Sequence, residues 1–423
     1  MHKTVHSAKV EDRSFDLTKY ILLILIGAAI FLLPYARVIY YDELLGYLKL
    51  APLQLGGVLA IYGTTSTVGT FLSGVLADRY SAKWLLVISL LVTGLGGFIL
   101  LSQPGYYSFM GLYILWGLSI TLTYNSAHYK AVRYAGSAKH QGKLFGSVGG
   151  LRFLVSGGIA MIAATIYSSY ASTSTEQGFV GVVWFYIAVY LCIALAVILF
   201  WKKDAPINVE ERWSPRDAIA VFRHPATWYI GLIIYGVYAM ARCLDLIAPY
   251  MRDIMQIEPG INAYINTFRV YFCTFAAGIS LGVLLDRTTT HKILACQIST
   301  AIAAVLFLAM AFIPAYGFFW QIMFALALCG GVIGQFGAYI TAFSLLEGAN
   351  VPKRITGSII GVSISIGFLP DIIINYLSNY LAEIYGIGPG CHYLLLIGAA
   401  HGLFAIAIYS MFSRYLKGLN AIS

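Results

Sequence analysis

The sequence predicts an all-α membrane protein, with twelve transmembrane helices arranged as two pseudo-symmetric bundles of six. Three observations lead to this fold class. Hydrophobic residues make up 59% of the 423-residue chain and charged residues only 11%, which is too little charge to cover the surface of a soluble protein of this size. Twelve apolar runs are each long enough to cross about 30 Å of hydrocarbon. A polar motif that follows the second run recurs in the second half of the chain.

Short polar connections separate the twelve predicted spans. The spans are residues 20–40, 53–77, 84–103, 106–129, 142–169, 178–201, 226–250, 261–285, 292–312, 316–346, 356–384 and 391–413. Several exceed the roughly 20 residues that a perpendicular helix needs, so we expect tilt or extension beyond the bilayer. Spans 5 and 10 contain several glycines, which in lipid allow neighbouring helices to approach closely.

The Lys and Arg residues are distributed very unevenly about these spans. Of the 27, twenty-one lie on the side that holds the N-terminus, only Lys49 and Arg252 lie on the other side, and four lie inside spans. By the positive-inside rule, this distribution predicts a multi-pass protein of the cell (inner) membrane with both termini cytoplasmic. The net charge of +9 therefore indicates membrane topology, and we expect a lipid bilayer and no nucleic acid as partner.

Five parts follow from the spans and their connections. They are a cytoplasmic tail (1–19), a six-helix bundle (20–201), a cytoplasmic linker (202–225), a second six-helix bundle (226–413) and a cytoplasmic tail (414–423). Within the linker, Ser214-Pro215 is typical of a helix start and Pro225 of a stop, so we expect a short amphipathic helix on the membrane surface. The six cysteines lie singly, without metal-ligand spacing, and no metal or other cofactor is expected. No cleavable signal peptide is evident before the first span.

A ten-residue stretch after the second span is repeated in the other half of the chain. Residues 74–83 read GVLADRYSAK, and a near copy, GVLLDRT, begins 208 positions later at Gly282. A second pair of motifs, GKLFG at 142–146 and GSIIG at 357–361, is offset by 215 positions. The two similar offsets indicate that a six-helix unit occurs twice, which suits alternating access about a central site.

The stretch 74–83 resembles the loop 2–3 signature of the major facilitator superfamily, G-x-L-a-D-r-x-G-r-k. The matching residues are Gly74, Leu76, Ala77, Asp78, Arg79 and Lys83, whereas Ser81 and Ala82 depart from the pattern. The resemblance extends to chain length, span count and halves, and it implies a secondary transporter with the fold of that superfamily. It also implies that Asp78 and Arg79 latch a cytoplasmic gate between helices 2 and 11. Asp286 and Arg287 occupy the equivalent place in the second half.

Two other signatures of that superfamily are absent. Drug–proton antiporters carry a Gly-Pro motif in helix 5, whereas residues 146–152 read GSVGGLR. Sugar porters carry P-E-S-P-R after helix 6, whereas residues 202–206 read KKDAP. Because these signatures are absent, we expect a drug–proton antiporter or a sugar porter less than other members of the superfamily.

Four arginines inside the spans predict the charge of the substrate. They are Arg37, Arg152, Arg242 and Arg269. An arginine in hydrocarbon costs at least about 2.5–3.5 kcal/mol, so each needs a reason. The mid-span carboxylates are only Asp245 and Asp371, which leaves an excess of positive charge. A guanidinium binds a carboxylate or phosphate through two parallel hydrogen bonds and keeps its charge, and the organophosphate and organic-anion porters of the resembled superfamily place arginines on comparable helices.

Each of these residues has an alternative role. Arg242 and Asp245 share a helix face and could neutralise each other, and Arg37 could extend to the outer headgroups. Asp371 could pair across the bundle with Arg152 or Arg269. Asp245 and Asp371 are the candidates for proton coupling, although an exchanger of two anions needs no titrating group. Aromatic and amide residues supply the rest of the predicted cavity: Tyr35, Tyr62, Tyr124, Asn125, Tyr235, Tyr238, Tyr271, Gln335, Tyr339 and Asn375.

Together these features predict a monomeric secondary transporter for a small organic anion, such as a carboxylate, a sugar acid or a phosphorylated metabolite. Proton symport and anion exchange are both compatible with the sequence. The main alternative is an efflux pump for a neutral or cationic compound. A sensor that kept the fold would need an output domain, and no large soluble segment is present. We do not expect an enzyme, because no phosphate-binding loop, metal-spaced His/Cys cluster or nucleophile motif stands out.

Overall fold

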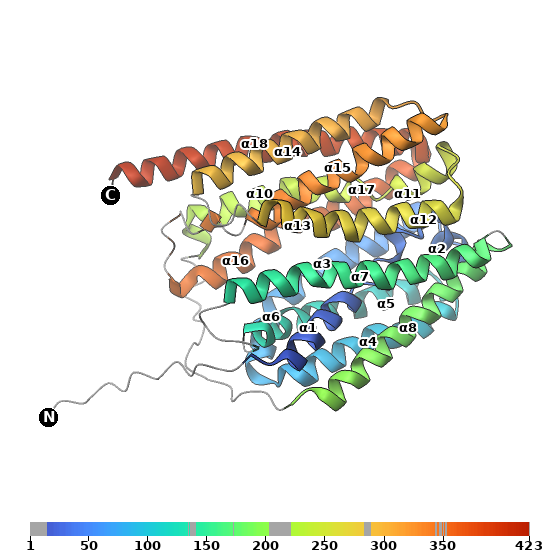
Figure 1. Ribbon diagram of the computed structural model, residues 1–423, viewed down its shortest axis with the longest axis horizontal. Coiled ribbons are helices and arrows are strands. Elements are labelled where there is room, and N and C mark those ends of the chain that lie inside the picture. The colour runs from blue at the N-terminus through green and yellow to red at the C-terminus, as the bar shows by residue number, and fades with distance from the viewer. Residues whose placement is uncertain are drawn as a thin grey trace.

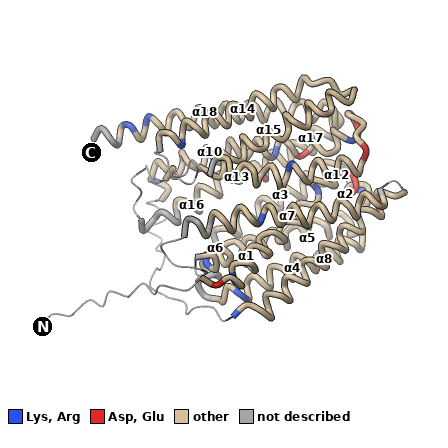
Figure 2. The backbone as a smooth tube through the Cα atoms, viewed as in Figure 1, with Lys and Arg blue, Asp and Glu red and all other residues tan. Residues whose placement is uncertain are grey.

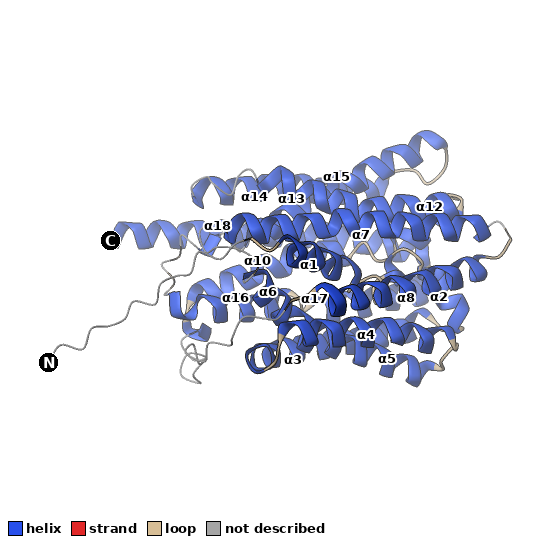
Figure 3. Cartoon of the chain, turned by 60° about the horizontal axis from the view of Figure 1, so that its bottom comes forward, coloured by secondary structure: helices blue, strands red, loops and turns tan. Residues whose placement is uncertain are grey.

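The computed structural model describes residues 15–133, 141–171, 173–202, 221–282, 289–342 and 353–422, with the isolated positions 135, 345–346, 349 and 351. Throughout this part of the chain the regular elements are helices and none is a strand. They lie lengthwise beside one another (Figure 1, Figure 3). Few Lys, Arg, Asp or Glu residues interrupt the middle of the bundle (Figure 2). The predicted all-α membrane fold is confirmed.

The first half contains six spans. Its helices are α1 (Leu17–Ala29), η1 (Ala36–Val38), α2 (Tyr41–Leu48), α3 (Pro52–Arg79), α4 (Ala82–Leu101), α5 (Tyr106–Leu118), η2 (Ser119–Asn125), α6 (Ser126–Arg133), α7 (Gln141–Ala171) and α8 (Thr175–Phe200). The Asp16 side chain caps α1 by accepting a hydrogen bond from the backbone N–H of Lys19, and Pro52 starts α3 where no intrahelical donor is needed.

The second half repeats this order. Its helices are α10 (Pro225–Arg242), α11 (Ile247–Pro249), η4 (Tyr250–Ile254), α12 (Pro259–Thr267), η5 (Phe268–Cys273), α13 (Thr274–Gly282), α14 (Thr289–Phe312), α15 (Phe318–Ala342), α16 (Lys353–Gly367), α17 (Pro370–Tyr385) and α18 (Ile387–Ile422). Among the described residues, eight helical stretches are long and apolar enough to span a membrane, and two of them, 225–254 and 359–385, combine consecutive elements. The other four spans are 17–38, 52–79, 106–133 and 259–282, whose helices are shorter, interrupted or less apolar.

Three predicted spans are not continuous helices, and in this respect the prediction is wrong. The eleventh breaks at 368–369, between α16 and α17, just before Pro370. The first span unwinds between Ala29 and η1, and the seventh unwinds at 243–246, between α10 and α11. A proline explains each break, because its ring clashes with the carbonyl four residues earlier and it has no N–H to donate. Pro34 and Pro249 are 215 positions apart, the same offset as the second repeated motif.

The two halves pack together most extensively through α3 against α17 and α7 against α12. The largest buried apolar cluster of the described residues runs through both halves. A second cluster, from Val221 to Leu416, belongs to the second half alone. The start of α1 and the end of α18 lie at the same end of the molecule (Figure 1). We call this end cytoplasmic and the opposite end outer, following the predicted distribution of Lys and Arg.

Several predicted features fall where side chains are not described. Asp78 and Arg79 lie in the last turn of α3, but the structure describes only their backbone. Asp286 and Arg287 lie outside the described residues, as does 203–220, which holds most of the predicted linker helix. The cytoplasmic latch and the amphipathic linker helix stay predictions.

Candidate substrate-binding site

The two unwound segments face each other across the boundary between the halves. The guanidinium carbon of Arg242, at the end of α10, lies 5.7 Å from the ring centre of Tyr35 in the first unwound segment. Arg37 lies two residues after Tyr35, in η1, and Asp245 lies in the turn after α10. Broken helices that line a cavity are a common way to form a substrate site in transporters.

Arg242 lies between two buried carboxylates. Its Nη1 is 3.7 Å from Oδ1 of Asp245, and its Nε is 3.8 Å from Oδ1 of Asp371. Both contacts are too long for hydrogen bonds, and these two guanidinium nitrogens have no acceptor. The expectation that Asp371 pairs with Arg152 or Arg269 is wrong. Proline restarts the eleventh span at 370, which places Asp371 in the first turn of α17 beside α10.

Tyr238 holds Asp371 in place. Its hydroxyl donates to the carboxylate and lies 3.0 Å from both Oδ1 and Oδ2. Its ring also lies 5.3 Å from the Arg242 guanidinium carbon, within the range of a cation–π contact. Tyr238 therefore orients both members of the ion pair.

We expect Tyr238→Phe to lower the initial transport rate about tenfold, because a hydrogen bond to a charged group contributes about 1.5–3 kcal/mol. The rate would be measured in proteoliposomes with the purified protein. Tyr235→Phe is the matched control and should keep the parental rate. Tyr235 was predicted to line the cavity, but it packs instead against His401 and Phe404 of α18. Equal rates in the two variants would contradict this role of Tyr238.

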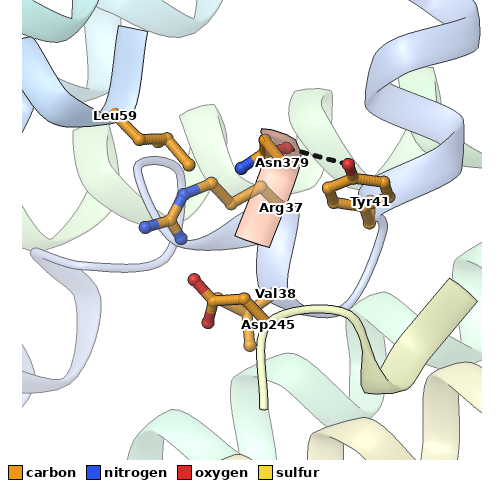
Figure 4. A pocket seen from close by; sticks show the side chains of 6 residues that line it. All are labelled: Arg37, Val38, Tyr41, Leu59, Asp245 and Asn379. Atoms are coloured by element: carbon orange, nitrogen blue, oxygen red, sulfur yellow. Dashed lines mark hydrogen bonds between the residues drawn. The ribbon is translucent and has the colours of Figure 1, made fainter. Parts of the chain in front are cut away.

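Arg37 is buried, with only 3% of its surface exposed. The alternative in which it extends to the outer headgroups is therefore wrong. It lines a small cavity with Val38, Tyr41, Leu59, Asp245 and Asn379. Figure 4 shows the Arg37 guanidinium and the Asp245 carboxylate facing the same space from opposite halves. The Nε and Nη1 of Arg37 have no hydrogen-bond acceptor. The Arg37 guanidinium carbon lies 5.0 Å from the ring centre of Tyr35.

Arg152 on α7 forms a second positive position nearer the cytoplasmic end. Its Cδ and the Tyr124 hydroxyl both lie beside Gly27 of α1, each 3.4 Å from where a Cβ at that glycine would be. The Nε of Arg152 and the hydroxyl of Tyr124 have no hydrogen-bond partner. The guanidinium carbon lies 4.7 Å from the ring centre of Phe153.

A row of aromatic rings connects the two positive positions. Neighbouring ring centres are 5.5 Å apart for Phe153 and Phe336, 5.2 Å for Phe336 and Tyr339, and 6.1 Å for Tyr339 and Tyr238. Gln335 on the same helix, α15, is buried and its Nε2 has no partner. Asn125 lies half-buried at the end of the π-helical segment η2.

Arg269 differs from the other three arginines because protein atoms accept its hydrogen bonds. Its Nε donates to Oδ1 of Asn266 at 3.1 Å, and its Nη2 donates to the carbonyl of Val38 at 3.5 Å. Asn266 in turn donates to Asn262, which donates to the carbonyl of Ala248. Arg269 thus links the eighth span to η1 at the outer end of the first span. The asparagines were not predicted, although their i, i+4 spacing before Arg269 is visible in the sequence.

Comparison with known proteins identifies the family. The model of the Major Facilitator Superfamily matches residues 20–375. The chain belongs to the Major Facilitator Superfamily. This confirms the resemblance carried by residues 74–83. It makes the protein a multi-pass membrane transporter of twelve spans and not an enzyme.

Relatives and solved structures of this superfamily cover nearly the whole chain. The inner membrane protein YihN of Escherichia coli (strain K12) is 25% identical over 379 residues, which is 87% of this chain and 88% of YihN. The inner membrane protein YqcE of the same strain is 23% identical over 420 residues, 92% of each chain. The crystal structure of the nucleoside transporter NupG is similar with a TM-score of 0.68, at 16% identity over 94% of this chain and 99% of NupG. The crystal structure of a bacterial homologue of the human lysosomal transporter Spinster, in an inward-facing and unoccupied conformation, is similar with a TM-score of 0.70. Its identity to this chain is 13%, over 96% of this chain and 99% of the homologue.

The outer side of this superfamily member is closed. Among the described residues, six hydrogen bonds and ion pairs join the two halves in the outer half of the molecule. They are Tyr41–Asn379, Leu53–Glu383, Tyr264–Thr165, Arg269–Val38, Arg252–Asp42 and Arg252–Glu43. These contacts therefore separate the central arginines from the solution on the outer side.

Proposed function

We propose that the protein transports a small organic anion, which binds between Arg37, Arg242 and Arg152. One observation carries this proposal: five buried guanidinium nitrogens have no hydrogen-bond acceptor. They are Nε and Nη1 of Arg37, Nε and Nη1 of Arg242, and Nε of Arg152. A buried donor without an acceptor costs about 1–3 kcal/mol. A carboxylate or phosphate of the substrate would supply the missing acceptors.

The aromatic row favours a substrate with a ring or a chain of carbon atoms beside its anionic group. Tyr35, Tyr238 and Tyr339 present flat apolar faces between the positive positions. Such faces suit a sugar ring or another flat body, whereas the guanidinium groups select its charged end. A sugar acid or a phosphorylated metabolite combines both features.

Asp371 is the proposed coupling group. It contacts the same arginine that the substrate would bind, so the carboxylate and the anion compete for Arg242. Protonation of Asp371 would remove its negative charge and release Arg242 to the substrate. The anion would then enter together with a proton, which is symport. Asp245, on the other side of Arg242, is the second candidate.

Binding by the purified protein tests this function. Small carboxylates, sugar acids and phosphorylated compounds would be screened for an increase in melting temperature. We expect at least one to bind, and we expect Arg37→Gln and Arg152→Gln each to raise its Kd at least about tenfold, because a hydrogen bond to a charged group contributes about 1.5–3 kcal/mol.

Lys49→Gln is the matched control, because it removes one positive charge from an exposed position outside the cavity. It should leave Kd unchanged. Binding of a neutral or cationic compound that anions do not displace would contradict the proposal and favour the efflux alternative.

A further inference from the structure

An ion-pair cluster joins the two halves at the outer end. Arg252 in η4 of the second half lies against α2 of the first half. Its Nη1 is 3.2 Å from Oδ2 of Asp42 and 3.8 Å from Oε1 of Glu43, and its Nε donates to Oδ1 of Asp253 at 2.8 Å. The Tyr167 hydroxyl on α7 donates to Glu43. Three carboxylates thus surround one guanidinium in the contact between the halves.

This cluster has more negative than positive charge. If Asp42, Glu43 and Asp253 are all ionised, the single positive charge of Arg252 leaves a net charge of two negative units. Burial raises the pKa of Asp42 from 3.8 to about 7; the Arg252 guanidinium lowers it in part, and Glu43 and Asp253 raise it further. Burial also raises the pKa of Glu43, against the hydrogen bond from Tyr167.

The cluster depends on contact between the halves. When the outer side opens, Arg252 moves away with the second half, and Asp42 regains the hydration that the contact removes. A hydrated aspartate has a pKa of about 3.9. Opening therefore changes the proton affinity of this carboxyl group.

The same short segment also forms part of the substrate cavity. Arg37 and Val38 line the cavity from η1, and Tyr41, at the start of α2, lines it beside them. The Tyr41 hydroxyl donates to Oδ1 of Asn379 on α17 at 2.8 Å (Figure 4). Asp42 is the next residue. The ion-pair cluster therefore begins five residues after the arginine that lines the cavity.

We propose that Asp42, Glu43 and Arg252 form a proton-dependent outer latch, which takes up a proton from the outer solution when the two halves close. The latch depends on the carrier fold and not on the nature of the substrate. It would hold even if the substrate were not an anion.

The direction of the pH effect follows from the two states. Between about pH 4 and pH 7, the closed state holds the proton on Asp42, whereas the open state has already released it. Lowering the pH through this range therefore stabilises the closed state relative to the open state. The ratio of closed to open molecules should rise by up to about tenfold for each pH unit.

Pulsed electron double resonance between two spin labels at the outer end tests the latch. Tyr107→Cys at the start of α5 and Phe318→Cys at the start of α15 are suitable positions, with 82% and 77% of their surface exposed. The exposed Cys192 would be replaced by Ser. We expect the short-distance population of the full-length protein in lipid nanodiscs to grow as the pH falls from 8 to 5.

Asp42→Asn should keep the outer side closed across this pH range and remove most of the pH dependence. Arg252→Gln should lower the closed population at every pH. Glu176→Gln removes an exposed outer carboxyl group at the start of α8 and should behave like the parent. A parent whose distances do not change with pH, or an Asp42→Asn variant with the parental pH dependence, would overturn the proposal.

Discussion

Replacing Arg242 with glutamine is expected to abolish transport and to destabilise the protein. Arg242 is buried between Asp245 and Asp371, so its loss would leave two buried carboxylates with Arg37 as the nearby counter-charge. Removing one partner of a buried ion pair costs about 3–5 kcal/mol. We expect the initial rate in proteoliposomes to fall at least about 100-fold, which corresponds to about 2.7 kcal/mol, and the melting temperature to fall as well.

Two further variants separate binding from stability. Arg242→Lys keeps the positive charge but loses the planar pair of donors, so it should retain the melting temperature and transport slowly. Combining Arg242→Gln with Asp371→Asn removes one charge of each sign and should recover part of the stability without recovering transport. If Arg242→Gln alone kept half of the parental rate, the central site would not be where we place it.

A leucine at Gly63 is expected to hold the outer side open. Gly63 on α3 lies directly against α17, where a Cβ would be 2.9 Å from Cγ1 of Ile372 and 3.0 Å from the carbonyl carbon of Asp371. Overpacking of this kind costs about 1–3 kcal/mol, which changes a two-state ratio by about 5- to 150-fold. Each half should remain folded, because the contact lies between the halves.

Transport by Gly63→Leu would be compared with transport by Gly111→Leu. Gly111 on α5 is exposed and has no atom within 4 Å of an added Cβ, so the same substitution there should have little effect. The spin-labelled pair at 107 and 318 should show a longer outer distance in Gly63→Leu. Equal transport by the two variants would mean that close approach of α3 and α17 is not needed.

Much of the fold could be predicted from the sequence, because crossing a bilayer imposes length and apolarity on every span. The repeated motifs correctly indicated two similar halves. The breaks in the first, seventh and eleventh spans were missed, since apolar runs continue through them and hydropathy does not register a proline. Pro34 and Pro249 nevertheless carry the signal, at the offset of 215 that a repeated motif already shows.

The residues of the candidate site and the contact of Arg242 with Asp245 could be chosen from the sequence, but the contact with Asp371 could not. The energetic cost of a buried charge singles out Arg37, Arg242 and Asp371 without any knowledge of structure. The contact of Arg242 with Asp371 joins two distant spans and depends on how α17 restarts at its proline. The role of Arg269 depends likewise on a carbonyl of another span.

The outer latch could not be predicted, because charged residues between spans are normally solvated. In the sequence, Arg252 is only one of two cations expected on the outer side. Its carboxylate partners Asp42 and Glu43 come from the other half of the chain. Closure of the two halves brings them together, and no local pattern encodes that contact.

Counterflow with a matched acid and amide tests anion selectivity most directly. Proteoliposomes would be loaded with the best-binding carboxylic acid, and uptake of the labelled acid would be compared with uptake of its labelled primary amide, which has nearly the same shape and no charge. We predict exchange of the acid at a rate at least about 100-fold above that of the amide, which corresponds to about 2.7 kcal/mol. Equal exchange of the acid and the amide, or faster exchange of the amide, would contradict an anion site at Arg37, Arg152 and Arg242.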